Sequence, residues 1–180
     1  MINIIAAISK NRVIGKDGRL IYKIPKDFKR MVNLTKGHPI IMGRKTFESK
    51  EIGKKALPNR TNIIVTRQAD YNAENCKVVH SIEEALEVAK KAVGAEEIFI
   101  FGGASIYREA LQKDIVDKIY LTVVDDECKG DTLFPKIDEN KWELIERETH
   151  SKDKQNKYNF EFRTYQRAKI WKERLQQQIQ

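Results

Sequence analysis

Apolar residues in the first hundred positions fall into short, nearly unbroken runs separated by amphipathic stretches. Residues 2–8 form such a run, rich in β-branched side chains, which predicts a central strand buried on both faces. Residues 9–18 are rich in turn-forming residues and predict a loop. Further strands are predicted at 39–42, 62–66, 77–79 and 97–101.

Helical spacing follows several of these strands. Pro25 opens a predicted helix over residues 26–35, because proline is favoured in a first helical turn. Residues 82–93 predict an amphipathic helix, with Ser81 as its N-cap and Glu84 at the capping-box position. The apolar stripe of the first helix consists of Phe28, Met31, Val32 and Leu34.

The last third of the chain changes character, with strands predicted at 118–124, 142–149 and 158–165 and no long helix between them. Alternating strands and helices followed by strands alone predict an α/β fold. We expect one domain over residues 1–165, with a mixed, mostly parallel central sheet, flanking helices and an antiparallel C-terminal edge. Residues 166–180 predict a basic, helix-forming extension, which either frays or packs against the body or a second subunit.

Composition limits the class of protein. The chain has 180 residues, 41% of them hydrophobic, which suits one substantial core. The sequence shows no signal peptide and no apolar run near the roughly 20 residues of a membrane span. Cys76 and Cys128 are predicted to be reduced thiols, so we expect a cytoplasmic protein with no metal site. The net charge of +8 favours anionic partners, which include both polyphosphate cofactors and nucleic acid.

Two predicted strand-to-helix junctions have features that suit phosphate binding. At the first, a buried strand meets Gly43 and then Arg44, Lys45 and Thr46, where a short helix begins; amides and cations there attract anions. An ordinary tight turn with a solvated basic pair explains the same residues. At the second junction, Gly102-Gly103 precedes a helix that ends near residue 111.

Paired glycines allow the backbone to approach a ligand closely, although the spacing is not that of the dinucleotide-binding fingerprint. The presence of both junctions in one chain predicts a dinucleotide site.

Asp27 is the third candidate feature, in the first turn of the helix after Pro25. It is either a surface aspartate that complements the helix dipole or a carboxylate in an apolar cleft. In a cleft, it could bind a flat amidine-like edge through two parallel hydrogen bonds. His38, His80 and His150 match no triad or metal motif and are predicted to be surface or loop residues. An enzyme with so few acid–base groups is expected to rely on a cofactor.

Several blocks of the sequence, taken in order, resemble the dihydrofolate reductase family from residue 1 to about 165. The blocks are Ile5-Ala6-Ala7-Ile8-Ser9, Val13-Ile14-Gly15, Pro25-x-Asp27, Ile41-Met42-Gly43-Arg44-Lys45-Thr46-Phe47-Glu48-Ser49, Leu57-Pro58-x-Arg60, Phe101-Gly102-Gly103, Ile119-Tyr120-Leu121-Thr122 and Gly130-Asp131-Thr132-x-Phe134-Pro135. The resemblance implies NADPH-dependent reduction of 7,8-dihydrofolate to 5,6,7,8-tetrahydrofolate.

The resemblance also implies roles around the substrate. Asp27 would bind the N3 and 2-amino edge of the pterin and favour its N5-protonated form, with Thr122 supporting the carboxylate. Arg60 would pair with the α-carboxylate of the glutamate tail. Leu20 and Tyr22 would belong to the catalytic group on a mobile loop. The pocket would be lined by Ile5, Ala6, Phe28, Met31 and Phe101.

On the cofactor side, the resemblance implies that backbone groups of Ala7, Ile14 and Gly15 meet the nicotinamide. Arg67, after a strand ending at Thr66, would lie beside the 2′-phosphate, and this cationic cluster favours NADPH over NADH. The family also has a cis bond between the paired glycines. The remaining cofactor positions would be Gly43, Arg44, Lys45, Thr46, Gly102, Gly103, Ala104, Ser105, Ile106 and Tyr107.

Three departures from the family pattern qualify the resemblance. Ile21-Tyr22 replaces the usual Pro-Trp, so Tyr22 would have to order the water near the pterin, and the loop motion and proton route to N5 are in question. Residues 50–55 are slightly expanded. The extension after residue 165 lies outside the resemblance. We expect a monomer, with self-association through the extension left open.

Two alternative functions follow from the same features. One is another NADPH-dependent reductase of the same fold, of the kind that acts on the pyrimidine intermediate of riboflavin synthesis. Asp27 and Arg60 favour folate over that substrate, since they suit a pterin edge and a glutamate carboxylate. The other is a basic nucleic-acid-binding protein, which the positive charge allows. The candidate residues lie at strand ends and not in a basic aromatic stripe, so we expect no nucleic-acid partner.

Overall fold

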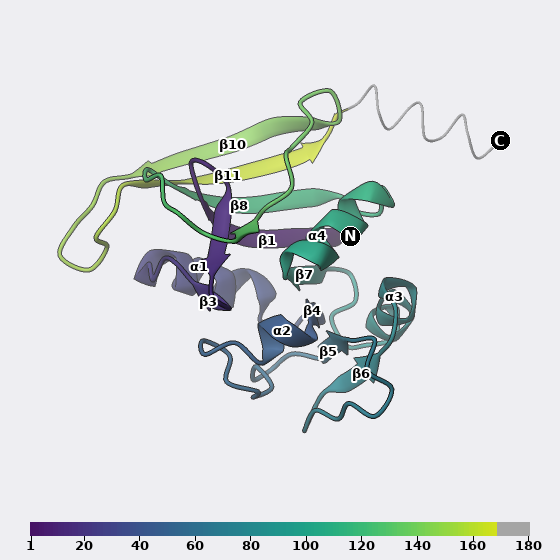
Figure 1. Ribbon diagram of the computed structural model, residues 1–180. Helices are drawn as coiled ribbons and strands as arrows, with labels where there is room; N and C mark the ends of the chain where they lie inside the picture. The colour runs from purple at the N-terminus through teal and green to yellow at the C-terminus, as the bar shows by residue number, and fades with distance from the viewer. Residues whose placement is uncertain (169–180) are drawn as a thin grey trace.

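An eight-stranded sheet crosses the protein in the order β10-β11-β8-β1-β7-β4-β5-β6 (Figure 1). The computed structural model describes residues 1–168, and the predicted helix in the extension lies outside these residues. The strands are β1 (Ile2–Ser9), β2 (Val13–Lys16), β3 (Arg19–Leu20), β4 (Ile40–Gly43), β5 (Asn62–Val65), β6 (Lys77–Val79), β7 (Ile98–Gly102), β8 (Lys118–Val124), β9 (Thr132–Leu133), β10 (Trp142–His150) and β11 (Phe160–Arg167). The helices are α1 (Pro25–Thr35), α2 (Arg44–Phe47), α3 (Ile82–Lys90) and α4 (Ala104–Gln112).

The topology confirms the predicted α/β fold. Pairing is parallel throughout the run from β8 through β1, β7, β4 and β5 to β6. At the other edge, β11 pairs antiparallel with β8, and β10 pairs antiparallel with β11. Strand β11 continues to Arg167, two residues beyond the predicted domain boundary at 165. The Arg167 side chain is buried; its Nε donates to the Val116 carbonyl (2.8 Å) and its Nη1 to Asp114 (2.8 Å). None of the helices among residues 1–168 has the length and apolar character that a membrane crossing requires.

Two local predictions were wrong. The segment 9–18, predicted as a loop, contains β2 and the turn into β3, which form a second sheet in the order β3-β2-β9. These strands are short and form because Val13 pairs with Leu133 far along the chain, which local patterning does not reveal. Helix α3 ends at Lys90 and not at residue 93, since Val93 is 88% exposed and Gly94 has a φ of 77°. The Ser81 cap is confirmed, because its hydroxyl accepts from the Glu84 amide.

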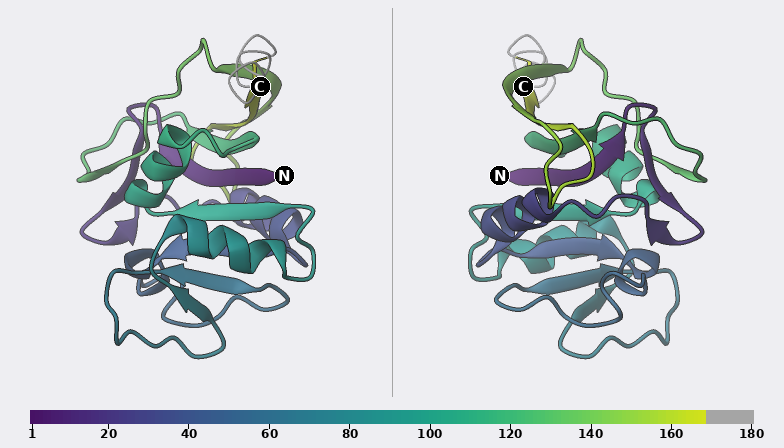
Figure 2. Two further views of the ribbon diagram at one scale, coloured as in Figure 1. Left: turned by 90° about the vertical axis from the view of Figure 1, so that its right-hand side faces the viewer. Right: turned by 90° about the vertical axis from the view of Figure 1, so that its left-hand side faces the viewer.

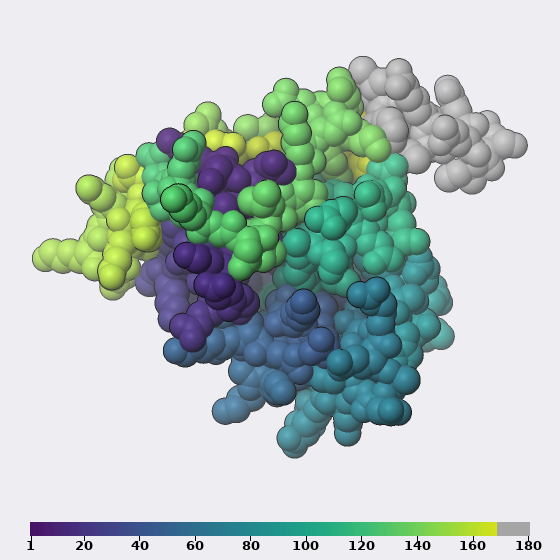
Figure 3. All heavy atoms as spheres, in the orientation of Figure 1, coloured from purple at the N-terminus to yellow at the C-terminus, as the bar shows by residue number. Residues whose placement is uncertain are grey.

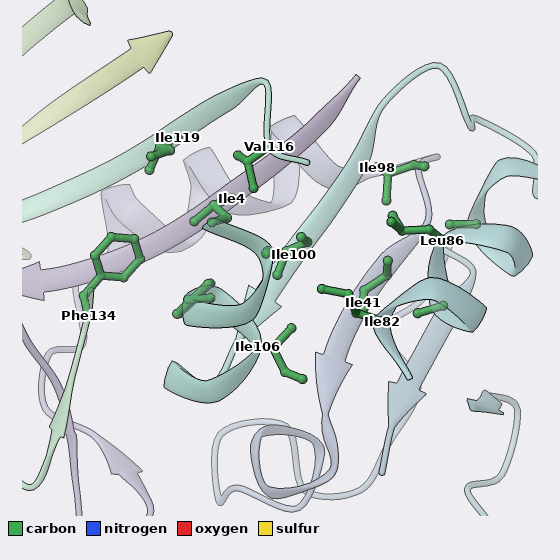
Figure 4. Packing of buried hydrophobic residues seen from close by; sticks show 14 of the residues in the cluster. Ile4, Ile41, Ile82, Leu86, Ile98, Ile100, Ile106, Val116, Ile119 and Phe134 are labelled. Atoms are coloured by element: carbon green, nitrogen blue, oxygen red, sulfur yellow. The ribbon is translucent and has the colours of Figure 1, made fainter. Parts of the chain in front are cut away.

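Helices cover both faces of the large sheet (Figure 2). On one face, α3 and α4 pack on the sheet through a cluster that includes Ile4, Ile41, Ile100 and Ile106 (Figure 4). On the other face, Phe47 of α2 belongs to a second cluster, against which α1 packs through partly buried side chains. The predicted stripe of α1 is only partly correct: Met31 and Leu34 contact the second cluster, whereas Phe28 is 64% exposed.

The first turn of α1 is capped by a residue from the other end of the chain. Ile24, at the N-cap, has no side chain that accepts a hydrogen bond. The fully buried Asn156, in the loop between β10 and β11, accepts from the Lys26 amide through its Oδ1 (3.2 Å). Its Nδ2 donates to both carboxylate oxygens of Asp153 (2.9 and 3.0 Å). This loop therefore fixes the start of α1 over the sheet.

We predict that Asn156→Ala lowers the free energy of unfolding by about 2 kcal/mol, because the variant loses a helix cap and leaves the Lys26 amide unpaired. Urea denaturation followed by circular dichroism measures the change. Gln155→Ala, at an exposed neighbour in the same loop, is the matched control and should change stability little. Equal stabilities for the two variants would contradict the capping role.

Candidate active site

Asp27 and Thr122 meet between α1 and the sheet. Asp27 lies in the first turn of α1, and Thr122 is a buried residue of β8. The Thr122 hydroxyl donates to Asp27 Oδ1 across 2.5 Å. The two candidate residues, 95 positions apart, are therefore in direct contact, and Asp27 is no solvated surface carboxylate.

Burial dominates the electrostatics of Asp27. Removal of water from the carboxylate raises its pKa, while the hydrogen bond from Thr122 and the positive charge of Arg30 each lower it. An ionised carboxylate in such a place interacts strongly with any donor or cation, since the surroundings screen charge weakly. The site can therefore hold a flat polar edge that presents two N–H groups.

Tyr107 connects this carboxylate to the glycine pair at the end of β7. Its buried hydroxyl donates to the Ile5 carbonyl of β1 across 2.7 Å. Burial and the nearby charge of Asp27 raise the pKa of Tyr107, so the phenol stays protonated at neutral pH. Gly102 has a φ of 90°, and a Cβ there would lie 2.6 Å from the Tyr107 ring. A side chain at this position would push the ring off Ile5.

The two predicted junctions lie side by side at the ends of β4 and β7. Met42 pairs with Gly102 in the parallel ladder, and a Cβ on Gly103 would approach the Thr46 hydroxyl to 3.3 Å. A Cβ on Gly43 would come equally close to Ile106. The peptide bond between Gly102 and Gly103 is cis, as the resemblance implied. The junctions therefore form one narrow surface of backbone, from which α2 and α4 begin.

Cations near this surface differ in how well they are paired. The Arg44 guanidinium contacts Glu48 (Nη1 to Oε2, 2.5 Å) and lies 5.9 Å from the centre of the Tyr71 ring. Lys45 and Arg67 are exposed, and neither forms a salt bridge within residues 1–168. Glu48 thus partly neutralises Arg44, whereas Lys45 and Arg67 are exposed.

Arg60 lies at the far end of α1 from the Lys26 amide. Its Nε donates to the Thr35 hydroxyl (2.9 Å), and its two terminal nitrogens donate to the carbonyls of Pro58 (2.6 Å) and Val32 (3.4 Å). Burial lowers the pKa of Arg60 without removing its charge at neutral pH. No carboxylate in the part of the chain that the structure describes forms a salt bridge with it. These three hydrogen bonds fix the orientation of the guanidinium.

Comparison with known proteins agrees with this geometry. The sequence model of dihydrofolate reductase matches residues 1–167. The chain is 42% identical to the dihydrofolate reductase of Bacillus subtilis (strain 168) over 167 residues, 93% of this chain and 95% of that protein. It is 39% identical to the type 3 dihydrofolate reductase of Salmonella typhimurium over 169 residues, 94% of this chain and 99% of that protein.

Among solved structures, the dihydrofolate reductase from Enterococcus faecalis complexed with NADP(H) and RAB-propyl has a TM-score of 0.85. It is 36% identical in sequence, and the match covers 93% of this chain and 96% of that chain. The chain belongs to the dihydrofolate reductase family.

The other predicted site residues of the chain occupy several environments. Ile5 belongs to the second core cluster, and Met31 and Phe101 pack against that cluster. Ala7 pairs with Thr122 in the β1–β8 ladder, which places its backbone next to the Asp27 contact. Among the remaining residues, Ala6, Ile14 and Ala104 are half-buried. Gly15, Thr66 and Ile106 are buried, and Leu20 and Ser105 are exposed.

Tyr22 is directed into a separate cluster. It is buried with Ile24, Val124 and Phe160, and its hydroxyl donates to Asp126 Oδ2 (2.9 Å) and lies 3.3 Å from Cys128 Sγ. Burial and both neighbours raise the pKa of Tyr22. The hydroxyl is thus bound to residues of the segment after β8. The role of Tyr22 in ordering water near the pterin stays a prediction.

The segment after β8 also holds the β2–β3 turn, a feature that the sequence analysis did not assign. The Asp131 carboxylate accepts from the Asp17 amide (2.7 Å), and the Asp131 amide donates to the Gly15 carbonyl (3.2 Å). A Cβ on Gly130 would lie 2.2 Å from Val13, so only glycine fits there. In Figure 3, purple atoms of the β2–β3 segment and green atoms after β8 lie against one another. The Gly130-Asp131 block was the only available signal for this contact.

His150 corrects another expectation. It was predicted to be a surface or loop residue, yet it ends β10 with its ring stacked on Phe160 (centroids 4.8 Å apart) and edge-on to Phe162 (4.7 Å). Its side chain is 12% exposed. The ring therefore packs as an aromatic residue at the edge of the sheet.

We predict that Tyr22→Phe lowers the free energy of unfolding by about 1 kcal/mol, because a buried hydroxyl loses its bond to Asp126. Tyr158→Phe is the matched control: Tyr158 packs edge-on against the same ring, so its variant keeps the aromatic contact and both Tyr22 bonds. Urea unfolding of the two variants measures the difference. A Tyr22→Phe variant as stable as the wild type would show that the hydroxyl does not hold the segment.

Proposed function

We propose that this protein reduces 7,8-dihydrofolate to 5,6,7,8-tetrahydrofolate with NADPH. The observation that carries the proposal is the half-buried Asp27 carboxylate, held by Thr122 and electrostatically coupled to Tyr107 next to the glycine pair. This arrangement brings a group suited to a pterin edge within reach of a surface suited to a dinucleotide. Membership of the family supports the same activity.

Asp27 acts on the pterin in two ways under this proposal. Its two oxygens accept from the N3 and 2-amino groups, which orients the ring, and its negative charge favours the N5-protonated form. Thr122 restricts the carboxylate to one orientation. Arg60 pairs with the glutamate α-carboxylate. The exposed side chains of Phe28 and Leu20 offer apolar contact to the bound substrate.

The residues at the two junctions fit a dinucleotide diphosphate. Gly43, Gly102 and Gly103 allow the backbone and the first turns of α2 and α4 to pack closely at this edge, and Thr46 and Ser105 add hydroxyl groups. Arg44, Lys45 and Arg67 supply positive charge for phosphates. When bound, NADPH supplies the hydride that the protein's own side chains cannot provide. Backbone groups of Ala7, Ile14 and Gly15 contact the nicotinamide, a role inferred from the family pattern.

We further infer a cytoplasmic monomer, with a catalytic domain that ends with β11 and a basic extension outside it. The buried anchor of Arg167 supports a boundary after that residue, since an earlier truncation would remove its bond to Asp114.

We predict that Asp27→Asn lowers turnover at neutral pH by about 10²-fold or more, because the neutral amide no longer favours a protonated pterin. The loss should diminish at acidic pH, where more of the substrate is protonated in solution. Loss of reduced-nicotinamide absorbance measures turnover. Glu143→Gln, the same carboxylate-to-amide change on the exposed edge strand, is the control and should retain activity. Wild-type turnover with a ribosylaminopyrimidine and none with dihydrofolate would refute the proposed function.

We predict that Arg67→Gln raises KM for NADPH about tenfold, which corresponds to one charge-assisted phosphate contact. KM for NADH should stay nearly constant, because that cofactor has no 2′-phosphate. Lys77→Gln removes an equally exposed cation from β6 and controls for general electrostatic attraction. Equal increases in KM for both cofactors would show that Arg67 does not bind the 2′-phosphate.

A further inference from the structure

Arg30 lies one turn after Asp27 in α1, and its guanidinium is turned onto the sheet. Its Nη1 donates to the Leu121 carbonyl (3.2 Å), and its Nη2 donates to the Thr164 hydroxyl (3.5 Å). Its Cζ stands 4.3 Å from the centre of the Phe162 ring. An arginine on a helix surface could extend into water, so this inward geometry needs a cause.

The surroundings of Arg30 connect it to Asp27 through β8. Leu121, which accepts from Arg30, precedes Thr122, which donates to Asp27. Phe162, under the guanidinium, is paired with Thr122 in the β8–β11 ladder. The cation and the carboxylate are thus held by consecutive residues of one strand. No carboxylate forms a salt bridge with Arg30 inside the range 1–168.

We propose that Arg30 is a positioning residue that keeps Asp27 ionised between α1 and the sheet, an inference that rests on the proposed function of Asp27. A buried carboxylate would otherwise take up a proton readily, and a neutral Asp27 would not favour a protonated pterin. Arginine suits this task, because it stays charged when partly buried and stacks on aromatic rings.

The charged and titratable groups around the pair agree with this role. Thr122 of β8 and Tyr107 of α4 face Asp27 together with Arg30, and of these only Arg30 carries a charge at neutral pH. Burial raises the pKa of Asp27, and the Arg30 charge lowers it. In turn, burial lowers the pKa of Arg30, and the charge of Asp27 is the largest influence that raises it.

Arg30 also has neighbours on its other side. Glu146 and Glu148 of β10 and Tyr120 of β8 raise its pKa. Thr164, which accepts from Arg30, donates its own hydroxyl hydrogen to the Glu146 carboxylate (3.0 Å). These carboxylates help to retain the positive charge of Arg30, and they lie on the edge strand.

The test is a carbon-13 NMR titration of the Asp27 carboxyl group in the ligand-free full chain, with the resonance assigned from Asp27→Asn. Arg30→Met keeps an apolar chain over Phe162 and removes the charge, and Arg30→Gln keeps a hydrogen-bond donor and removes the charge. Both variants should raise the pKa of Asp27. Arg30→Lys should restore most of the wild-type titration. Lys29→Gln, which removes the exposed cation next in sequence, should leave it unchanged.

Activity gives a second readout. The ratio of variant to wild-type kcat/KM should stay near its neutral-pH value in alkaline solution and fall toward acidic pH. The fall is at most tenfold for each unit by which the pKa of Asp27 rises. It does not go below the ratio that Asp27→Asn shows at the same pH, because that variant is the limit of a fully neutral side chain. An unchanged Asp27 titration in either folded charge-removing variant would overturn the role of Arg30. Absence of turnover in the wild type would refute the proposed function alone, because the titration needs no turnover.

Discussion

The hydrogen bond between Thr122 and Asp27 is the contact on which the site depends. Transfer of a carboxylate out of water is strongly unfavourable unless donors and cations meet it, and here a hydroxyl on the sheet does so across 2.5 Å. The bond holds the first turn of α1 against β8. Asn156 holds the same turn through its hydrogen bond with the Lys26 amide. One turn of helix is therefore held by two elements distant in sequence. Several independent contacts of this kind are needed to keep a charged carboxylate away from water.

Parallel strand pairing accounts for the other half of the site. Neighbouring parallel strands end at the same edge of a sheet. The pairing of β4 with β7 therefore brings their terminal glycines together independently of the loop sequences. The glycines at 43, 102 and 103 then allow two helices to begin closer to one another than side chains would permit. Tyr107, in the first turn of α4, reaches back to Ile5 and joins this edge to the pocket of Asp27. The position of Asp27 relative to the glycines at the ends of β4 and β7 therefore follows from the strand order and from the Tyr107 contact.

Much of this arrangement is predictable from local sequence, because buried parallel strands are short apolar runs and Ser81 is a strong cap. Local patterns contain nothing about partners far along the chain. The strand at Val13 depends on Leu133, the cap of α1 on Asn156, and the direction of Tyr22 on Asp126. The family pattern identified the candidate residues. It could not show that Tyr22, which replaces a tryptophan, has its polar end engaged elsewhere.

Strand β8 is the element through which these separate contacts act on one another. Within it, Leu121 accepts from Arg30 and Thr122 donates to Asp27. Directly after it, the Asp126 carbonyl accepts from the Lys10 amide at the end of β1, and its carboxylate accepts from Tyr22. Asp27 is thus attached to β8 itself, and Tyr22 is attached to the segment that follows β8. A displacement of the segment after β8 would act on Tyr22 directly, and it would reach Asp27 through β8 or through Ile24, which packs with Tyr22 and is the N-cap of α1. The Thr122 contact and the Asn156 cap both hold the first turn of α1, so they limit how far such a displacement moves Asp27.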